Sequence, residues 1–222
     1  MSLNLLVLFD VDGTLLLSHD ELYVQANADA LREVYGVTGV RHPDDPGDTA
    51  LHYTRLVLEA AGFDRAQIDE GLERWCAAIS RRYVELLTRA DTDDWKIAPG
   101  AAAILARIPH RALLTGNPEA IARARLQRMG LAEFFAEEEG AYGCERERRT
   151  ALIDLALARA GDWTADRSVA VGDTPRDIHT AREAGARCIA VATGAFDREQ
   201  LAAADRVIDA LAELPNALAS LD

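Results

Sequence analysis

Short runs of mostly apolar residues recur along the chain, and each ends abruptly at a polar loop. Four such runs lie at residues 5–9, 111–114, 168–171 and 188–192. A short apolar run without polar alternation is typical of a strand that is buried on both faces of a parallel sheet. Because helical patterns separate these runs, their order predicts an α/β fold with a doubly wound parallel sheet.

Helical patterns with ordinary end signals lie between the strand patterns. They cover residues 118–129, 150–160 and 176–184. Pro118 falls in the first turn of the first helix, and a glycine follows the end of each one. Proline at a helix start and glycine just past a helix end are the positions where these residues are favoured.

The long region between the first and second strand patterns lacks a strand signal and contains three further helical patterns. They cover residues 20–35, 49–61 and 67–89. This region is far longer than one crossover connection needs, and the breaker Ala98-Pro99-Gly100 marks its end. We therefore expect a core domain of residues 1–16 and 95–222 and an all-helical cap domain of residues 17–94. The alternative is that these helices only cover a face of the sheet.

The composition is that of an ordinary folded protein, with 49% hydrophobic and 27% charged residues. The formal net charge of −13 argues against binding to nucleic acid or to a membrane surface through bulk charge. No stretch approaches the roughly 20 apolar residues of a membrane span. The apolar run at residues 5–9 is too short for a signal peptide and no basic residue precedes it.

The three cysteines, Cys76, Cys144 and Cys188, are far apart and form no CxxC spacing. An odd number of dispersed cysteines favours a reduced, cytoplasmic protein whose thiols are small packing residues. We therefore expect a cytoplasmic location and no disulfide framework.

Polar residues follow the strand patterns directly, where an open parallel sheet binds its ligands. They are Asp10, Asp12, Thr115, Asn117, Asp173 and Asp177. For each acid by itself, a turn or helix cap is the better explanation. Four carboxylates that converge would raise one another's pKa unless a cation neutralised them. An oxygen-only set of ligands suits Mg²⁺, so the sequence predicts a magnesium site.

The same loops offer groups that suit a phosphate. Backbone amides that can donate to its oxygens belong to Gly13, Gly116 and Asn117. Asp10 and Asp12 are two residues apart, so one carboxylate can attack phosphorus while the other handles the proton of the leaving oxygen. The phosphoryl group also needs a fixed cation. Lys96 is the only lysine and lies beside the breaker Ala98-Pro99-Gly100, where we expect the hinge between cap and core, so that cation should be an arginine.

Three motifs occur in order, each after a strand pattern. They are Asp10-Val11-Asp12-Gly13-Thr14, Leu114-Thr115-Gly116-Asn117 and Gly172-Asp173-Thr174-Pro175-Arg176-Asp177. Through them the chain, from residue 5 to about residue 214, resembles the haloacid dehalogenase superfamily. The resemblance implies a Rossmann-like core and an inserted helical cap that closes over the substrate and excludes water.

The resemblance also implies roles for the motif residues. Asp10 would be the nucleophile and Asp12 the general acid and base. Mg²⁺ would be bound by Asp10, the Asp12 carbonyl and Asp173, with Asp177 supporting its water shell, and Thr115 would bond the phosphoryl group. Further phosphate or substrate contacts are expected from Gly13, Thr14, Gly116, Asn117 and His19. For His19, as for His52 and Arg55 of the expected cap, an ordinary surface or packing role is the alternative.

One departure from the family pattern concerns the lysine that most relatives carry before the helix leading to the motif at residues 172–177. This chain has Glu145-Arg146-Glu147-Arg148-Arg149-Thr150 there. Counting back from the end of the expected helix favours Arg149 as the phosphate clamp, with Arg148 as the second choice and a solvated charge run as the alternative. An arginine fork suits phosphate oxygens.

We therefore expect a Mg²⁺-dependent phosphatase that acts on a small phosphorylated metabolite, resembles phosphoglycolate phosphatases and uses an aspartyl-phosphate intermediate. A mutase that resembles β-phosphoglucomutase is the nearest alternative. Dehalogenases of the superfamily lack an acid at the position of Asp12, and phosphonatases need a cap lysine that this chain does not have. We expect a monomer or homodimer.

Two alternatives belong to other classes of protein. A phospho-accepting signalling domain of the receiver type has clustered acids around Mg²⁺, but it is about half this length and needs no helical insertion. A non-catalytic protein that binds sugar phosphates would not need the pair Asp10 and Asp12.

Overall fold

The computed structural model describes residues 4–39, 47–161 and 163–221. Within these residues, six parallel strands form one sheet in the order β3-β2-β1-β4-β5-β6. They are β1 (Leu6–Phe9), β2 (Arg111–Thr115), β3 (Ala141–Tyr142), β4 (Ser168–Gly172), β5 (Arg187–Val191) and β6 (Arg206–Ile208). The four expected strands are confirmed. The two that the sequence did not predict are the edge strands β3 and β6, which have two and three residues and are too short to show a pattern.

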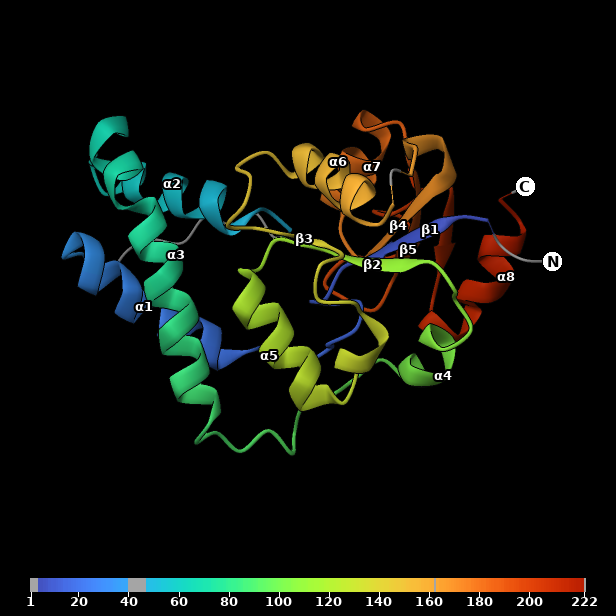
Figure 1. Ribbon diagram of the computed structural model, residues 1–222, viewed down its shortest axis with the longest axis horizontal. Coiled ribbons are helices and arrows are strands. Elements are labelled where there is room, and N and C mark those ends of the chain that lie inside the picture. The colour runs from blue at the N-terminus through green and yellow to red at the C-terminus, as the bar shows by residue number, and fades with distance from the viewer. Residues whose placement is uncertain (1–3, 40–46, 162, 222) are drawn as a thin grey trace.

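Helices cover both faces of the sheet (Figure 1). On one face lie α4 (Ala101–Leu105), α5 (Glu119–Met129) and α8 (Leu214–Ala219); on the other lie α6 (Arg149–Arg159) and α7 (Pro175–Glu183). Short 3₁₀ turns, η1 (Ala132–Phe134), η2 (Ala165–Arg167) and η3 (Leu211–Glu213), complete the connections. Alternate residues of β1 pack into the two apolar clusters, so the doubly wound α/β fold is confirmed.

In the described part of the insertion between β1 and β2, three helices form the cap, which projects beyond the sheet at the left of Figure 1. They are α1 (Glu21–Tyr35), α2 (Ala50–Ala60) and α3 (Arg65–Leu87), each within two residues of its expected bounds. The cap has its own apolar cluster around Trp75, Ile79 and Tyr83, and Ile121 of α5 also packs into it. Within the described ranges no helix is long and apolar enough to cross a bilayer.

The two segments that join the cap to the sheet lie side by side. The Leu17 N–H donates to the Lys96 carbonyl at 2.7 Å, and the Ala98 N–H donates to the Leu15 carbonyl at 2.9 Å. Lys96 is exposed here. Because both connections pass through one short antiparallel pairing, the cap enters and leaves the core at a single place.

The expectation that all three cysteines are reduced packing residues is wrong. Cys76 of α3 forms a disulfide with Cys144, which follows β3, and only Cys188 is free and buried. The bonded pair is separated by 68 residues in the sequence and has no recognisable spacing. The fold brings the two thiols together because α3 packs beside the core. The disulfide therefore joins the cap covalently to the core.

Candidate active site

A cavity of about 790 Å³ lies between the carboxyl ends of the strands and the cap. Asp10, Thr115 and Asp173 follow or end three neighbouring strands and line it from the core. Tyr23 and Tyr53 line it from the cap helices α1 and α2. Strand β1 lies at the point where the chain order reverses across the sheet, which is where doubly wound folds place their ligands. The cavity is therefore the candidate active site.

Asp10 lies directly after the central strand β1 and is 5% exposed. One carboxylate oxygen accepts the Val11 N–H at 2.8 Å, and the other lies 3.2 Å from Nη2 of Arg149. Burial raises the pKa of Asp10 to about 7, against the opposing effect of Arg149 and with the repulsion of Asp177 and Asp12. The carboxylate thus lies in a site that disfavours a negative charge unless a further cation is present.

Asp173 and Asp177 complete a cluster with Asp10 in which carboxylate oxygens of all three lie within 4.8 Å of one another. Burial and the charges of Asp10 and Asp177 raise the pKa of Asp173 to about 8. A Cβ on Gly13 would lie 2.1 Å from a carboxylate oxygen of Asp173, so the loop approaches this side chain closely. The other oxygen of Asp173 is buried and has no hydrogen-bond partner.

These observations fit a divalent cation. The cluster supplies hard oxygen ligands, one of which is buried without a partner, and a cation would offset the burial and the mutual repulsion that raise the pKa of Asp10 and Asp173. Of the three carboxylates, Asp177 has the most hydrogen bonds within the protein, because it accepts one from Nη2 of Arg149 at 2.5 Å and one from the Thr174 hydroxyl at 2.6 Å. Asp10 and Asp173 are therefore the carboxylates best placed to bind Mg²⁺.

Arg149, the first residue of α6, carries its guanidinium between Asp10 and Asp177. Its side chain is buried, lines the cavity and also donates to the Gly47 carbonyl, which lies just before α2. Burial opposes its charged form, but Asp177 and Asp10 outweigh that effect and raise its pKa further. Arg148, the second choice from the sequence, is exposed. Of the two arginines, Arg149 is the one that lines the cavity beside Asp10.

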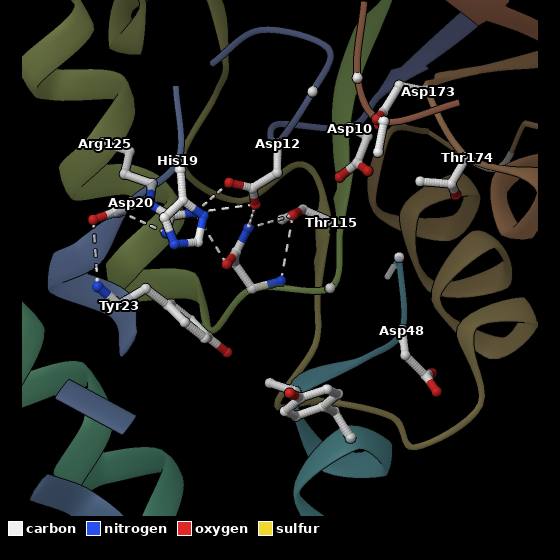
Figure 2. Close-up of a pocket in the computed structure, with 18 of the residues that line it drawn as sticks. Asp10, Asp12, His19, Asp20, Tyr23, Asp48, Thr115, Arg125, Asp173 and Thr174 are labelled. Atoms are coloured by element: carbon white, nitrogen blue, oxygen red, sulfur yellow. Dashed lines mark hydrogen bonds and ion pairs between the residues drawn. The ribbon is translucent and has the colours of Figure 1, made fainter. Parts of the chain in front are cut away.

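Asp12 lies in the cavity with its side chain half-exposed. Its carboxylate accepts Nδ2 of Asn117 at 2.5 Å, and the same amide donates to the Thr115 hydroxyl at 3.0 Å. Among the described residues, the three-carboxylate cluster does not include Asp12. The carboxylate of Asp12 therefore lies outside the group of carboxylates that could together hold a metal ion. Figure 2 shows that it points toward Arg125, away from Asp10 and Asp173.

The remaining expected residues differ in their placement. Gly116 and Gly13 line the cavity, and a Cβ on Gly116 would lie 2.0 Å from the Asp48 carbonyl, so only glycine allows the cap to approach β2 this closely. His19 lines the cavity with a largely exposed side chain that lies 3.5 Å from Glu21. Thr14 is fully buried and is not among the residues that line the cavity.

The two other cap residues considered from the sequence, His52 and Arg55, do not line the cavity. Nδ1 of His52 lies 2.5 Å from Asp48. Arg55 is buried between Glu147 of the core and Asp69 of α3 at 2.6 Å from each. Their observed contacts join protein groups to one another, which agrees with the packing alternative.

The sequence interpretation missed several cavity residues, of which Arg125 is the most buried. Its side chain is 2% exposed and contacts both Asp12 and Asp20. The sequence did contain a signal for Arg125. It lies four residues after Ile121 and four before Met129, and all three residues lie on the buried face of α5. A charged residue on such a stripe is buried only with partners. Its partners lie far away in the sequence, so only the fold reveals them.

Known proteins share both the sequence features and this fold. Residues 5–185 match the family of haloacid dehalogenase-like hydrolases. A phosphoglycolate phosphatase of Synechococcus elongatus is 30% identical over 221 residues, which cover 97% of each chain. The structure of CbbY from Rhodobacter sphaeroides in complex with phosphate aligns with a TM-score of 0.67 and 25% identity, covering 96% of this chain and 98% of that chain. β-Phosphoglucomutase from Clostridium difficile aligns with a TM-score of 0.70 and 15% identity, covering 97% of both chains.

The match covers the sheet from β1 through β4, the helical cap and all three motifs, and a relative of nearly the same length is similar over almost the whole chain. The helices inserted after β1 also argue against a receiver-type signalling domain. The chain belongs to the haloacid dehalogenase-like hydrolase family.

Proposed function

We propose that this phosphoric monoester hydrolase removes phosphate from a small phosphorylated metabolite through an aspartyl-phosphate intermediate. The main support is the placement of Asp10, whose carboxylate lies in the cavity 3.2 Å from the Arg149 guanidinium and beside Asp173 and Asp177. A nucleophile next to a fixed cation and a cation site is what phosphoryl transfer requires. Phosphoglycolate is the first substrate to test, because it gives the similar bacterial phosphatase its name.

The reaction has two displacements at phosphorus. An oxygen of Asp10 forms a bond to phosphorus, the bond from phosphorus to the alcohol oxygen breaks, and the Asp12 carboxyl gives that oxygen its proton. Water then attacks the same phosphorus, transfers a proton to Asp12 and displaces Asp10, which releases inorganic phosphate. Arg149 and the Thr115 hydroxyl orient the phosphoryl oxygens and stabilise their negative charge.

Asp10 and Asp173 are the carboxylates proposed to bind Mg²⁺, together with the backbone carbonyl of Asp12 and with Asp177 supporting the site. When bound, Mg²⁺ neutralises negative charge on the phosphoryl oxygens and on the acidic cluster. The raised pKa values of Asp10 and Asp173 and the unpartnered oxygen of Asp173 support this assignment.

The cap is proposed to exclude water from the first displacement, so that the alcohol leaves before water enters. We assign residues 1–16 and 95–222 to the core domain and residues 17–94 to the cap domain. The separate apolar cluster of α1, α2 and α3 and the paired connections at residues 15–18 and 95–98 support this division. The cytoplasmic location stays a prediction.

The experiment measures release of phosphate from 4-nitrophenyl phosphate and from a panel of small metabolites that includes phosphoglycolate, with and without Mg²⁺. We expect turnover that requires Mg²⁺, and a loss of about 10⁴-fold or more for Asp10→Asn, because a carboxamide cannot form the covalent intermediate. Full turnover by folded Asp10→Asn would contradict the assignment. Transfer of the phosphoryl group to a sugar instead of water would identify the mutase alternative.

A further inference from the structure

A second buried guanidinium lies in the wall of the cavity, and the proposed reaction does not use it. Arg125 projects from the middle of α5, with a side chain only 2% exposed. Burial opposes its charge, but Asp12, Tyr83 and Asp20 outweigh that effect and raise its pKa above the ordinary arginine value. Arg125 is therefore a permanent cation whose partners determine what it does.

One end of Arg125 holds the carboxylate of Asp12. Nη1 lies 3.0 Å from both carboxylate oxygens, and it also donates to the amide oxygen of Asn117 at 3.1 Å. The amide nitrogen of Asn117 donates to Asp12 at 2.5 Å. A half-exposed aspartate on a loop would otherwise sample several rotamers. These donors from the core select one of them.

The other end of Arg125 reaches the cap. Nε and Nη2 lie 2.8 and 2.6 Å from one carboxylate oxygen of Asp20, and the hydroxyl of Tyr83 donates to the same oxygen at 2.6 Å. The other oxygen of Asp20 accepts the backbone N–H groups of Leu22 and Tyr23 and so caps the start of α1. Asp20 and Tyr83 thus connect two cap helices to the group that holds Asp12.

We propose that Arg125 is the positioning residue for Asp12, and that it makes the orientation of this carboxylate depend on the cap through Asp20 and Tyr83. This inference rests on the proposed function, in which Asp12 transfers the proton to the leaving oxygen. Arg125 does not act as a clamp for a second anionic group of the substrate, because Asp12, Asn117, Asp20 and Tyr83 occupy its three nitrogens.

A positioning role predicts an effect that depends on the leaving group. A phenolate that is already a good leaving group needs little proton transfer, whereas a more basic one needs it in the transition state. Loss of Arg125 should therefore slow the hydrolysis of phenyl phosphate much more than that of 4-nitrophenyl phosphate. A structural defect alone would slow both substrates by the same factor, since they occupy the cavity in similar ways.

The test measures kcat and KM for a series of aryl phosphates from 4-nitrophenyl to phenyl phosphate, with Mg²⁺ present. For Arg125→Gln we expect kcat to fall about 100-fold on phenyl phosphate and about threefold on 4-nitrophenyl phosphate, with KM nearly unchanged. Asp12→Asn should make kcat depend on the leaving group in the same direction and more steeply. The double variant should be no steeper than Asp12→Asn alone, because the two residues act as a unit.

The matched control is Arg128→Gln on the same helix. Arg128 also connects α5 to the cap, by donating to the Leu87 carbonyl at 2.6 Å, but no hydrogen bond or ion pair to Asp12 is present among the described contacts. We expect this variant to keep the wild-type dependence on the leaving group. An equally steep dependence in Arg128→Gln would assign the effect to the cap in general and overturn the role of Arg125.

The remaining outcomes separate the two proposals. If Arg125→Gln does not fold, Arg125→Lys decides, because an ammonium group lacks the fork that spans Asp12 and Asp20. Folded Arg125→Lys with the wild-type dependence would overturn the inference, and intermediate steepening would support it. If Asp12→Asn itself leaves the dependence unchanged, the proton-transfer role within the proposed function is wrong. A change with Asp12→Asn but not with Arg125→Gln refutes only the role of Arg125.

Discussion

Two buried arginines face the same cavity, each between two aspartates, and they differ in their charge balance. Arg125 lies between Asp12 and Asp20. Arg149 lies between Asp10 and Asp177, but a third carboxylate, Asp173, shares its cluster. Burial and its carboxylate neighbours raise the pKa of Asp173 to about 8.

This difference shows which of the two arginine–carboxylate clusters lacks a hydrogen-bond partner when no ligand is bound. In the Arg125 cluster, Asp12 and Asp20 accept hydrogen bonds from Arg125, Asn117 and Tyr83, so both carboxylates have donors within the protein. In the Arg149 cluster, one oxygen of Asp173 is buried without a partner. A buried charge that the protein leaves unpaired is stable only when something else pairs with it. The first cluster orients a side chain, whereas the second is suited to bind a cation and a phosphoryl group.

The largest expected effect in this comparison comes from the removal of Arg149. Arg149→Ala removes the fixed cation beside Asp10, and we expect kcat for 4-nitrophenyl phosphate to fall about 10²–10³-fold. The exposed neighbour provides the control, because Arg148→Ala should change kcat by less than about twofold. The opposite ranking of the two variants would show that Arg148 is the clamp. Thermal unfolding of both variants checks that the loss is not a failure to fold.

The cap and the core are joined covalently near only one of the two arginines. The Cys76–Cys144 disulfide reaches the core just before Arg149, whereas Arg125 is connected to the cap by noncovalent contacts alone. Its removal frees a loop of 68 residues in the unfolded chain, which costs about 4 kcal/mol of stability at 25 °C. We expect Cys76→Ser to lower Tm by about 10 °C, as measured by thermal unfolding under non-reducing conditions.

Reduction of the wild-type protein should lower Tm by a similar amount and leave the unfolding of Cys76→Ser unchanged. Titration of thiols should find one in the unfolded, unreduced protein, namely Cys188, and three after reduction. Because the Arg125 contacts do not involve the disulfide, the dependence of kcat on the leaving group should survive reduction. Three titratable thiols before reduction would contradict the disulfide.

The smallest expected effect concerns pH and Mg²⁺. Asp10 and Asp173 have folded-state pKa values of about 7 and about 8, both above the ordinary value of 3.8. Between the ordinary pKa of 3.8 and these folded-state values, the two carboxyl groups keep protons in the folded, metal-free protein that they have released in the unfolded chain. Their contribution to stability is therefore complete below about pH 4 and is lost as the pH rises through 7 to 8. Replacement of Arg125 should leave this loss in place, because both acids belong to the Arg149 cluster.

Mg²⁺ should oppose this loss, because it pairs with the carboxylates once they are ionised. We expect it to raise Tm by several degrees at about pH 8.5 and by less at about pH 6, where protons compete for the same oxygens. Thermal unfolding with and without Mg²⁺ at both pH values measures the difference. Asp173→Asn removes one proposed ligand and should reduce the Mg²⁺ effect at the higher pH. An equal effect of Mg²⁺ at both pH values would contradict the cation site.

Much of the fold and part of the site could be predicted from local pattern. The four predicted strands are mostly apolar runs, and six helices, among them α1 with its caps Asp20 and Gly36, were predicted within two residues of their bounds. The short helices α4 and α8 were not predicted. The acids after β1 and β4 were found because a parallel sheet gathers its carboxyl ends at one edge. Edge strands β3 and β6 were missed, since strands of two and three residues have no readable period.

The features that sequence patterns missed or got wrong depend on contacts between distant residues. The Cys76–Cys144 pairing and the contacts of Arg125 with Asp12 and Asp20 join residues separated by 68, 113 and 105 positions. Thr14 belongs to the first motif, yet its side chain lies outside the cavity lining, because the loop turns it inward.

By itself, the sequence determined the doubly wound sheet, the helical insertion, the order of the acidic motifs and the need for an arginine in place of a lysine. These features are local, since apolar period, caps and residue type act over a few neighbouring positions. Only the tertiary structure decided which arginine faces which carboxylate and which charges stay unpaired. Burial and pairing depend on the atoms that the fold brings within a few ångströms, and these belong to residues as far as 139 positions apart.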